Sequence, residues 1–210
     1  MFWRLRVSII TSLMIFDASI FGQDAAQKLA RGTIRAAAGP AIYSLWPYAR
    51  QGINAKIKTT LGLLVEGGLD PTGALEIAVF PVEQEIRLTT GADSFVIYSA
   101  HRLNITTSYR YYIMPSFSIA LGLKSSYSMG DLHRVGNRGE EHRSIDKNLV
   151  NQPTRYLLDL SVQLSLWQRV KNSLILDVRY AKYFANPSLV AADQLTIFLA
   201  VRYQIPKPTR

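Results

Sequence analysis

The chain has 210 residues, a formal net charge of +9 and no cysteine, and 48% of its residues are hydrophobic. This length allows one sizeable domain or two small ones, and the lack of cysteine excludes disulfides and thiolate metal sites. The positive charge is compatible with nucleic acid, but the Lys and Arg residues are scattered instead of forming a stripe, so we expect no nucleic-acid partner. Anionic lipid headgroups or polysaccharide fit this charge better.

The first 22 residues have the features of an export signal. Arg4 and Arg6 precede a mostly apolar run from Val7 to Phe16, and Gly22 offers a small residue at a cleavage point. We therefore expect a signal peptide at 1–22 and a periplasmic segment at 23–31; an uncleaved anchor and a buried helix are the alternatives. After this region no apolar run reaches about 18 residues, so we expect no transmembrane helix in the mature chain.

The remainder of the chain alternates between apolar and polar residues, most regularly from Tyr156 to Trp167. A period of two indicates a β-strand, and alternation over about 9–11 residues suits a tilted strand that crosses a bilayer. We expect strands at 33–46, 54–66, 74–88, 95–113, 116–127, 155–168, 172–184 and 194–205. The apolar parity changes near Phe80 and Pro81, which predicts a bulge there. The first strand, rich in Ala and Gly, is poorly patterned.

The connections between these strands differ in length. Short joins at Gly67 to Gly73, Met114 to Pro115 and Arg169 to Asn172 contrast with the long polar connection from Ser128 to Thr154. Outer-membrane barrels have short periplasmic turns and longer extracellular loops. The pattern therefore predicts a periplasmic N-terminus and an extracellular 128–154 loop.

Alternation alone also fits a soluble ligand-binding barrel, whose apolar face points inward. The interior of an eight-stranded barrel is only wide enough to be filled by side chains, and the large apolar face of these strands would overfill it. The sequence therefore predicts an all-β protein, an eight-stranded antiparallel up-and-down transmembrane β-barrel over 32–206, followed by a tail at 207–210. We expect aromatic girdles at the outer ends (Tyr43, Tyr127, Tyr156, Tyr180) and at the periplasmic ends (Tyr109, Tyr111, Phe117, Tyr203).

In this architecture residues 32–206 resemble the small eight-stranded outer-membrane β-barrels of Gram-negative bacteria, which include OmpA-type transmembrane domains and opacity-like proteins. The resemblance rests on architecture and not on a diagnostic motif. It implies an outer-membrane location, contact with membrane lipid and lipopolysaccharide, and a last strand that the barrel-assembly machinery reads. Leu195 to Tyr203 fit such a strand, whereas Ile205 stands where the family usually has an aromatic residue.

The inward parity carries charges of both signs. Charges in a narrow lumen are costly unless they are paired and hydrogen-bonded, so we expect a network of ion pairs that fixes the shape of the barrel. A narrow anion-preferring pore is the alternative. The expected lumen network consists of Lys56, Lys58, Glu66, Glu76, Arg110, Lys124, Asp159, Asp177, Arg179 and Arg202.

The segment from Gly130 to Lys147 is dense in charges of both signs. The plainer interpretation is a solvated loop; the sharper one is a surface for lipopolysaccharide or a partner protein, formed by Arg134, Arg138, Arg143 and Lys147. We expect a structural or surface-interaction role for the protein.

Residue types for a lipid-A-modifying barrel enzyme are present. They are His101, His133 and His142, with Ser99, Ser128, Ser144, Glu140 and Glu141. They show no triad spacing, so we expect no catalytic activity. No glycine-rich phosphate loop and no metal-ligand spacing occur, so we also expect no cofactor.

Overall fold

The computed structural model describes residues 31–47, 56–89, 95–130, 133–138, 155–169, 171–183 and 192–206. The expected signal peptide, the 207–210 tail and all but the last residue of the 23–31 segment lie outside this part of the chain. Among the described residues, no helix is long and apolar enough to cross a membrane.

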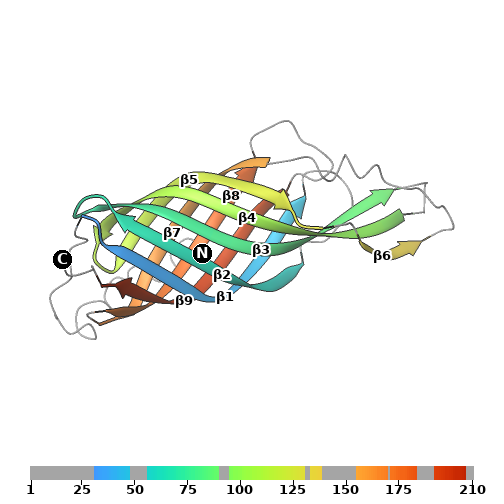
Figure 1. The fold of residues 1–210 in the computed structure, drawn as a ribbon. Helices are drawn as coiled ribbons and strands as arrows, with labels where there is room; N and C mark the ends of the chain where they lie inside the picture. Colours follow the sequence, from blue (N-terminus) through green and yellow to red (C-terminus); the bar gives the residue numbers. More distant parts are fainter. Residues whose placement is uncertain are drawn as a thin grey trace, which may run out of the picture.

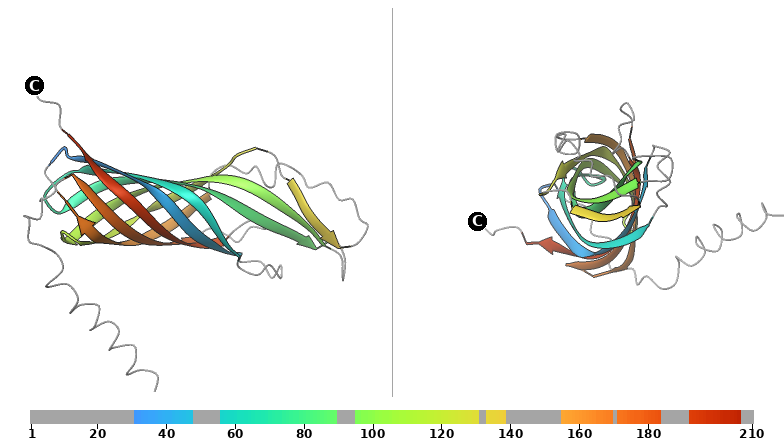
Figure 2. Two further views of the ribbon diagram at one scale, coloured as in Figure 1. Left: turned by 90° about the horizontal axis from the view of Figure 1, so that it is seen from below. Right: turned by 90° about the vertical axis from the view of Figure 1, so that its right-hand side faces the viewer.

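Eight strands close into an antiparallel barrel (Figure 1). Each strand pairs with the next along the barrel, and β1 pairs with β9 to complete the ring, which the end-on view of Figure 2 shows. The barrel strands are β1 (Ile34–Pro47), β2 (Ile57–Gly68), β3 (Gly73–Thr89), β4 (Phe95–Met114), β5 (Phe117–Ser128), β7 (Arg155–Gln168), β8 (Asn172–Tyr183) and β9 (Ala192–Ile205). The predicted fold class is confirmed.

A further strand, β6 (His133–Arg138), lies within the connection that the sequence presented as a loop. It pairs with β4 between Phe95 and Ser99, whereas β5 pairs with β4 only from Arg102 onward. β3 and β4 remain paired as far as Thr89 and Phe95. The strands β3, β4 and β6 therefore continue as a sheet past the barrel, which we call the sheet extension (Figure 1).

The turns differ in length at the two ends of the barrel. At one end the strands are joined by 69–72, 115–116 and 169–171, and at the other by 48–56, 90–94, 129–154 and 184–191. We call these the short-turn end and the long-loop end. The predicted topology, in which short turns are periplasmic, would place the sheet extension on the extracellular side.

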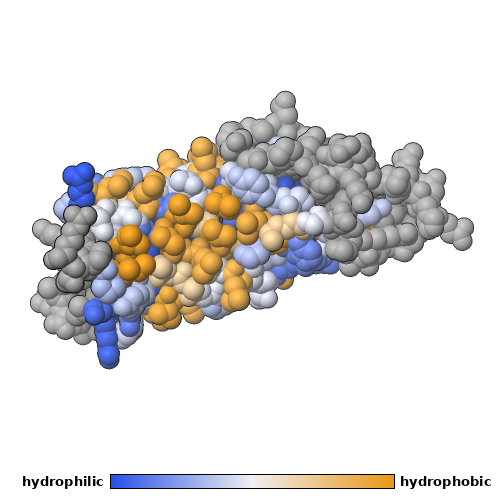
Figure 3. Space-filling model, in the orientation of Figure 1, coloured by the Kyte–Doolittle hydropathy of each residue, from blue (hydrophilic) through white to orange (hydrophobic). Residues whose placement is uncertain are grey.

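Large apolar side chains cover the outside of the barrel in a band that Figure 3 shows in orange. Leu61, Leu121 and Val201 are 72%, 56% and 60% exposed. Exposed aliphatic side chains on this scale are stable against lipid and not against water. On β3 the outward positions change from Ile77 to Glu83 and Glu85, which marks the upper limit of the band.

The bulge expected near Phe80 and Pro81 is absent from β3, whose register with β4 is continuous from Gly73 to Thr89. Phe80 and Val82 both face the interior and are buried. Both side chains belong to an apolar cluster in the interior on this side of the barrel. Apolar residues at alternate positions of a strand therefore do not always face lipid.

This cluster occupies one side of the barrel interior. It consists of Ala37, Ala41, Tyr43, Leu64, Ala78, Phe80, Val82, Ile175, Phe198 and Ala200. The rings of Phe80 and Phe198 meet edge to face, with 5.2 Å between centroids. Gly62 makes room for them, since a Cβ there would lie 2.3 Å from Phe80. Packing of these rings against β2 therefore requires a residue without a side chain.

Candidate functional site

The middle of the lumen is filled by ion pairs centred on Glu76. Its carboxylate accepts hydrogen bonds from Arg110, from Arg179 Nη2 at 2.6 Å and from the Ser108 hydroxyl at 2.9 Å. Arg179 also donates to Asp177 Oδ2 at 2.6 and 2.8 Å. The side chains in these ion pairs are at most 3% exposed. Because each charge has an opposite partner in a desolvated space, this arrangement fixes the barrel instead of opening it.

A second group of charges lies nearer the short-turn end. Arg202 Nη1 lies 3.4 Å from Glu66 Oε2, and the Tyr112 hydroxyl donates to the same oxygen at 2.6 Å. Arg202 also donates to Gln163 at 3.0 Å and to Ser173 at 2.9 Å. Several strands are thus tied together across the lumen by one guanidinium, whose rigid fork of donors suits this task.

Lys124 and Asp159 lie at the long-loop side of the network. Lys124 donates to Gln194, which also accepts from Asn104 at 2.9 Å. Asp159 Oδ1 lies 3.5 Å from Arg179 Nη1. Together the eight residues of this buried charge network are four carboxylates (Glu66, Glu76, Asp159, Asp177) and four cations (Arg110, Lys124, Arg179, Arg202). The charges of these eight residues balance, so the centre of the lumen has no excess of positive charge.

Two residues expected in the lumen lie elsewhere. Lys56 and Lys58 are at the outer rim, where Lys56 pairs with Glu85 at 2.9 Å and Lys58 with Glu83 and Glu85 at 3.1 Å. The Lys56 side chain is 62% exposed. The prediction was wrong because β2 pairs with β3 only from Leu63 onward. Before Leu63 the two strands are not paired, so the side chains on the inward face of β2 reach solvent there.

A cavity of about 800 Å³ lies where β2 and β3 separate. Its lining includes Tyr43, Ile57, Lys58, Val82 and Met129. Tyr43 was expected in the outer girdle, but it faces the interior and is only 4% exposed. The expectation failed because the Ala-rich β1 did not reveal its parity, which pairing with β9 sets instead.

The remaining girdle residues face outward where their side chains are described. Tyr127 and Tyr180 are exposed toward the long-loop end, and Tyr109, Tyr111 and Tyr203 toward the short-turn end. Phe117 is half-buried. Tyr156 is opposite Ser125 in the β5–β7 register, and its side chain lies outside the described part. Two aromatic levels at the edges of an apolar band are typical of membrane interfaces.

Of the residues considered for catalysis, Ser99, His101 and Ser128 have described side chains, and the Ser99 hydroxyl donates to Glu83. Ser99 is 3% exposed, so its oxygen is shielded from a substrate. The side chains of the expected surface group, Arg134, Arg138, Arg143 and Lys147, lie outside the described residues, as do those of His133 and His142. His101 is exposed and stands opposite Glu83 in the β3–β4 register, and Ser128 stands opposite Arg102 in the β4–β5 register. Ser99 and His101 thus both lie beside Glu83 at the rim, where Glu83 also pairs with Lys58.

Three buried residues that the sequence analysis did not single out belong to the interior: Arg35, Arg102 and Tyr112. Arg102 shares its inward parity with Arg110, so the alternation of β4 could have identified it. Arg35 lies on the poorly patterned β1, and the aromatic ring of Tyr112 gave no signal of a lumen position. Arg35 and Arg102 are buried cations in addition to the eight residues of the buried charge network. They lie toward opposite ends of the barrel.

No protein-family model matches the chain, and no curated protein matches it in sequence. Among solved structures, the chain is similar to the outer membrane protein OprG from Pseudomonas aeruginosa, with a TM-score of 0.58 and 13% identity over 85% of this chain and 98% of OprG. This similarity extends to the whole barrel. The fold is that of the small eight-stranded outer-membrane β-barrels.

Two further structures are similar at lower scores. Ail, the attachment invasion locus protein of Yersinia pestis, has a TM-score of 0.48 and 11% identity over 83% of this chain and 99% of Ail. The outer membrane protein AlkL has a TM-score of 0.42 and 13% identity over 90% of this chain and 97% of AlkL. At such sequence identities the similarity concerns the fold alone, and the function of this barrel must be argued from its own residues.

Proposed function

We propose that this outer-membrane barrel is a non-enzymatic scaffold that presents the sheet extension and the 128–154 connection for contact with lipopolysaccharide at the cell surface. The observation that carries the proposal is the length of the paired strands. β4 has 20 residues and β3 has 17, whereas a strand needs about 9–11 residues to cross a bilayer. The surplus raises an ordered sheet above the lipid band.

The charges of the chain support lipopolysaccharide as the partner. The expected surface group of Arg134, Arg138, Arg143 and Lys147 belongs to β6 or to the connection after it. Lipopolysaccharide carries phosphate groups, which Arg and Lys bind by charge-assisted hydrogen bonds. The buried charge network supports the scaffold role, because a lumen filled with ion pairs resists deformation when the outer part is loaded.

The test replaces these four cations together by Gln and measures the melting temperature of the purified barrel in micelles with and without lipopolysaccharide. We expect lipopolysaccharide to raise the melting temperature of the wild type, because a ligand that binds only the folded state stabilises it. We expect the Gln variant to lose most of this rise. A control variant exchanges Arg for Lys and Lys for Arg at the same positions, keeps the charge and should keep the rise.

An undiminished rise in the Gln variant would reject the extension as a lipopolysaccharide contact. Barrel closure of each variant is checked by heat-modifiable gel mobility, so that a misfolded variant is not mistaken for a loss of binding. We also propose that the end of the last strand, at Tyr203 and Ile205, contacts the barrel-assembly machinery. Replacing Ile205 by Phe restores the aromatic residue that is usual at this position, so Ile205→Phe should leave assembly unchanged or improve it.

The narrow pore remains the competing function. Because the network side chains are at most 3% exposed and fill the lumen, we expect the wild-type protein to show no steady conductance in a planar bilayer. An anion-selective current from the wild type would favour the pore over the scaffold.

A further inference from the structure

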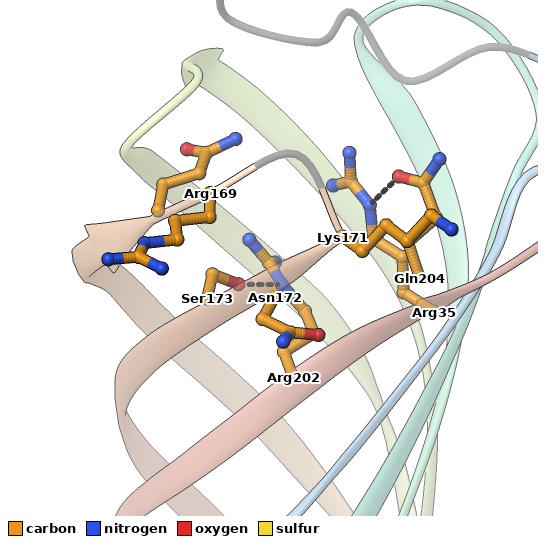
Figure 4. A pocket seen from close by; sticks show the side chains of 8 residues that line it. Arg35, Arg169, Lys171, Asn172, Ser173, Arg202 and Gln204 are labelled. Carbon is orange, nitrogen blue, oxygen red and sulfur yellow. Dashed lines mark hydrogen bonds between the residues drawn. The ribbon is translucent and has the colours of Figure 1, made fainter. Parts of the chain in front are cut away.

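The short-turn end carries a group of cations around a shallow recess. Its lining includes Arg35 from β1, Arg169 and Lys171 from the β7–β8 turn, and Gln204 from β9. Figure 4 shows Arg35, Lys171 and Gln204 gathered at one side of the recess, whereas the Arg169 side chain points away from them. Arg202 also lines the recess, but its guanidinium is held by the buried charge network.

Arg35 is the unusual member of this group, because it is only 7% exposed. Its interactions are a 3.4 Å hydrogen bond from Nε to Gln204 Oε1 and a position 5.9 Å from the centre of the Tyr112 ring. Glu66 is opposite Arg35 in the β1–β2 register, but that carboxylate is taken by Tyr112 and Arg202. Within the described part of the chain, no carboxylate pairs with Arg35.

The two cations of the turn are exposed, unlike Arg35. Arg169 lies over the ring of Trp167 at 5.0 Å, and neither Arg169 nor Lys171 forms an ion pair with any residue that the structure describes. A buried guanidinium without an opposite charge is costly. Arg35 and Lys171, together without an acid among the described residues, therefore favour an anion supplied from outside this part of the chain.

The position of the recess identifies the kind of anion. Trp167, beside Arg169, is 44% exposed on the outside of the barrel, and Tyr203 is 42% exposed on the neighbouring β9. Exposed Trp and Tyr side chains mark the headgroup level of a bilayer. The recess is only about 10 Å³ in volume, which is about the space of one water. A ligand therefore binds at the mouth of the recess and not inside it, and at the headgroup level this position suits a lipid phosphate.

We propose that Arg35 and Lys171 bind the phosphate of a phospholipid headgroup in the membrane leaflet at the short-turn end, with Arg169 at the edge of the site. The Arg35 guanidinium can donate two parallel hydrogen bonds to phosphate oxygens, and the Lys171 ammonium adds a point charge. The site lies at the opposite end of the barrel from the sheet extension, so it is independent of lipopolysaccharide binding.

The experiment measures lipid binding to the purified full chain in detergent by native mass spectrometry and by melting temperature. The probes are phosphatidylglycerol, diacylglycerol of the same acyl chains, and inorganic phosphate. The test variants are Lys171→Gln, Arg35→Gln and the double variant, and the matched control is Lys182→Gln at the other end of β8. Heat-modifiable mobility confirms that each variant forms the barrel.

We expect phosphatidylglycerol to bind the wild type and the Lys182→Gln control equally, and each test variant about tenfold more weakly, the size expected for a lost charge-assisted hydrogen bond. Diacylglycerol should not distinguish the variants. A further sign separates binding from a structural role: without lipid, Arg35→Gln should melt no lower than the wild type, because it removes an uncompensated buried charge.

Three outcomes would overturn the proposal. The first is equal phosphatidylglycerol affinity in the wild type and in the Lys171→Gln variant. Lys171 is exposed, so this variant should fold. The second is equal stabilisation by inorganic phosphate and by phosphatidylglycerol, which would identify a free-phosphate site. The third is a lower melting temperature of Arg35→Gln in the absence of lipid, which would assign Arg35 a purely structural task.

Discussion

The hydroxyl of Tyr43 on β1 forms hydrogen bonds with both backbone groups of Glu83 on β3. It accepts from the Glu83 N–H at 2.7 Å and donates to the Glu83 carbonyl at 3.3 Å. These strands are separated by β2, whose pairing with β3 ends at Leu63 and Val79. The Tyr43 hydroxyl thus takes the place of a backbone hydrogen bond between β2 and β3 where these strands separate. It satisfies backbone groups of Glu83 beside the cavity of about 800 Å³.

Tyr43→Phe should therefore destabilise the barrel by about 1–3 kcal/mol, since it leaves buried backbone groups unsatisfied. Tyr127→Phe is the control, because Tyr127 faces outward with 42% exposure. The measurement is denaturant unfolding in micelles, followed by tryptophan fluorescence. Equal losses in the two variants would mean that the Tyr43 hydroxyl does not hold the β2–β3 junction.

Glu76→Gln should be strongly destabilising, by about 3–5 kcal/mol, because it leaves Arg110 and Arg179 without their shared carboxylate in a buried site. Glu85→Gln on the same strand should cost no more than about 1 kcal/mol, since its ion pairs with lysines lie at the rim. The same unfolding assay compares the two. A small effect at Glu76 would mean that other groups of the lumen, such as Asp177, compensate for the lost charge.

The assignment of faces on β7 can be tested with adjacent residues. Leu160 is 50% exposed in the apolar band, and Asp159 is 2% exposed in the lumen. Leu160→Arg should reduce stable membrane insertion, since a lipid-facing Arg near the midplane costs about 2–4 kcal/mol. Asp159→Asn should be much milder, because Asp159 contacts Arg179 only at 3.5 Å. The measurement is the fraction of heat-modifiable protein in isolated outer membranes. Equal fractions for the two variants would contradict the assignment of Leu160 to the lipid face and Asp159 to the lumen.

The turn between β2 and β3 should contribute an acid-sensitive part of the stability. Asp70 Oδ1 accepts hydrogen bonds from the Thr72 N–H at 2.8 Å and from its hydroxyl at 2.9 Å. These bonds lower the pKa of Asp70 below its ordinary value of 3.8. The stabilisation is therefore complete above the unfolded pKa and is lost as the pH falls through the lower, folded pKa.

Melting temperatures measured between about pH 2 and pH 6 should show this loss in the wild type below about pH 4. Asp70→Asn keeps an acceptor for Thr72 but cannot titrate, so its melting curve should lack this part of the acid dependence. Because Asp70 lies in a surface turn and is accessible to solvent, the difference should be small. Parallel pH profiles for the two proteins would show that the turn carboxylate does not contribute.

The strands with large apolar residues could be located from the sequence because burial against lipid on one side imposes a strict period of two. β5, β7, β8 and β9 are of this kind, and their outward residues are those expected. β1 could not be oriented, since Ala36, Ala38 and Gly39 fit either face; only the register with β9 decides that Arg35 and Tyr43 point inward. β3 misled the analysis for a related reason, because the interior cluster made Val82 apolar on the lumen side.

The sequence by itself determined the number of barrel strands, the two classes of connection and eight of the buried charges, because these depend on local alternation and composition. Only the tertiary structure decided which charges meet. Arg110, Arg179 and Glu76 are far apart along the chain and come together through closure of the barrel. The same closure leaves Arg35 without an acid among the described residues of the short-turn end, and the pairing of β6 with β4 builds the sheet extension. Such contacts depend on strand register across the whole ring, which no local pattern specifies.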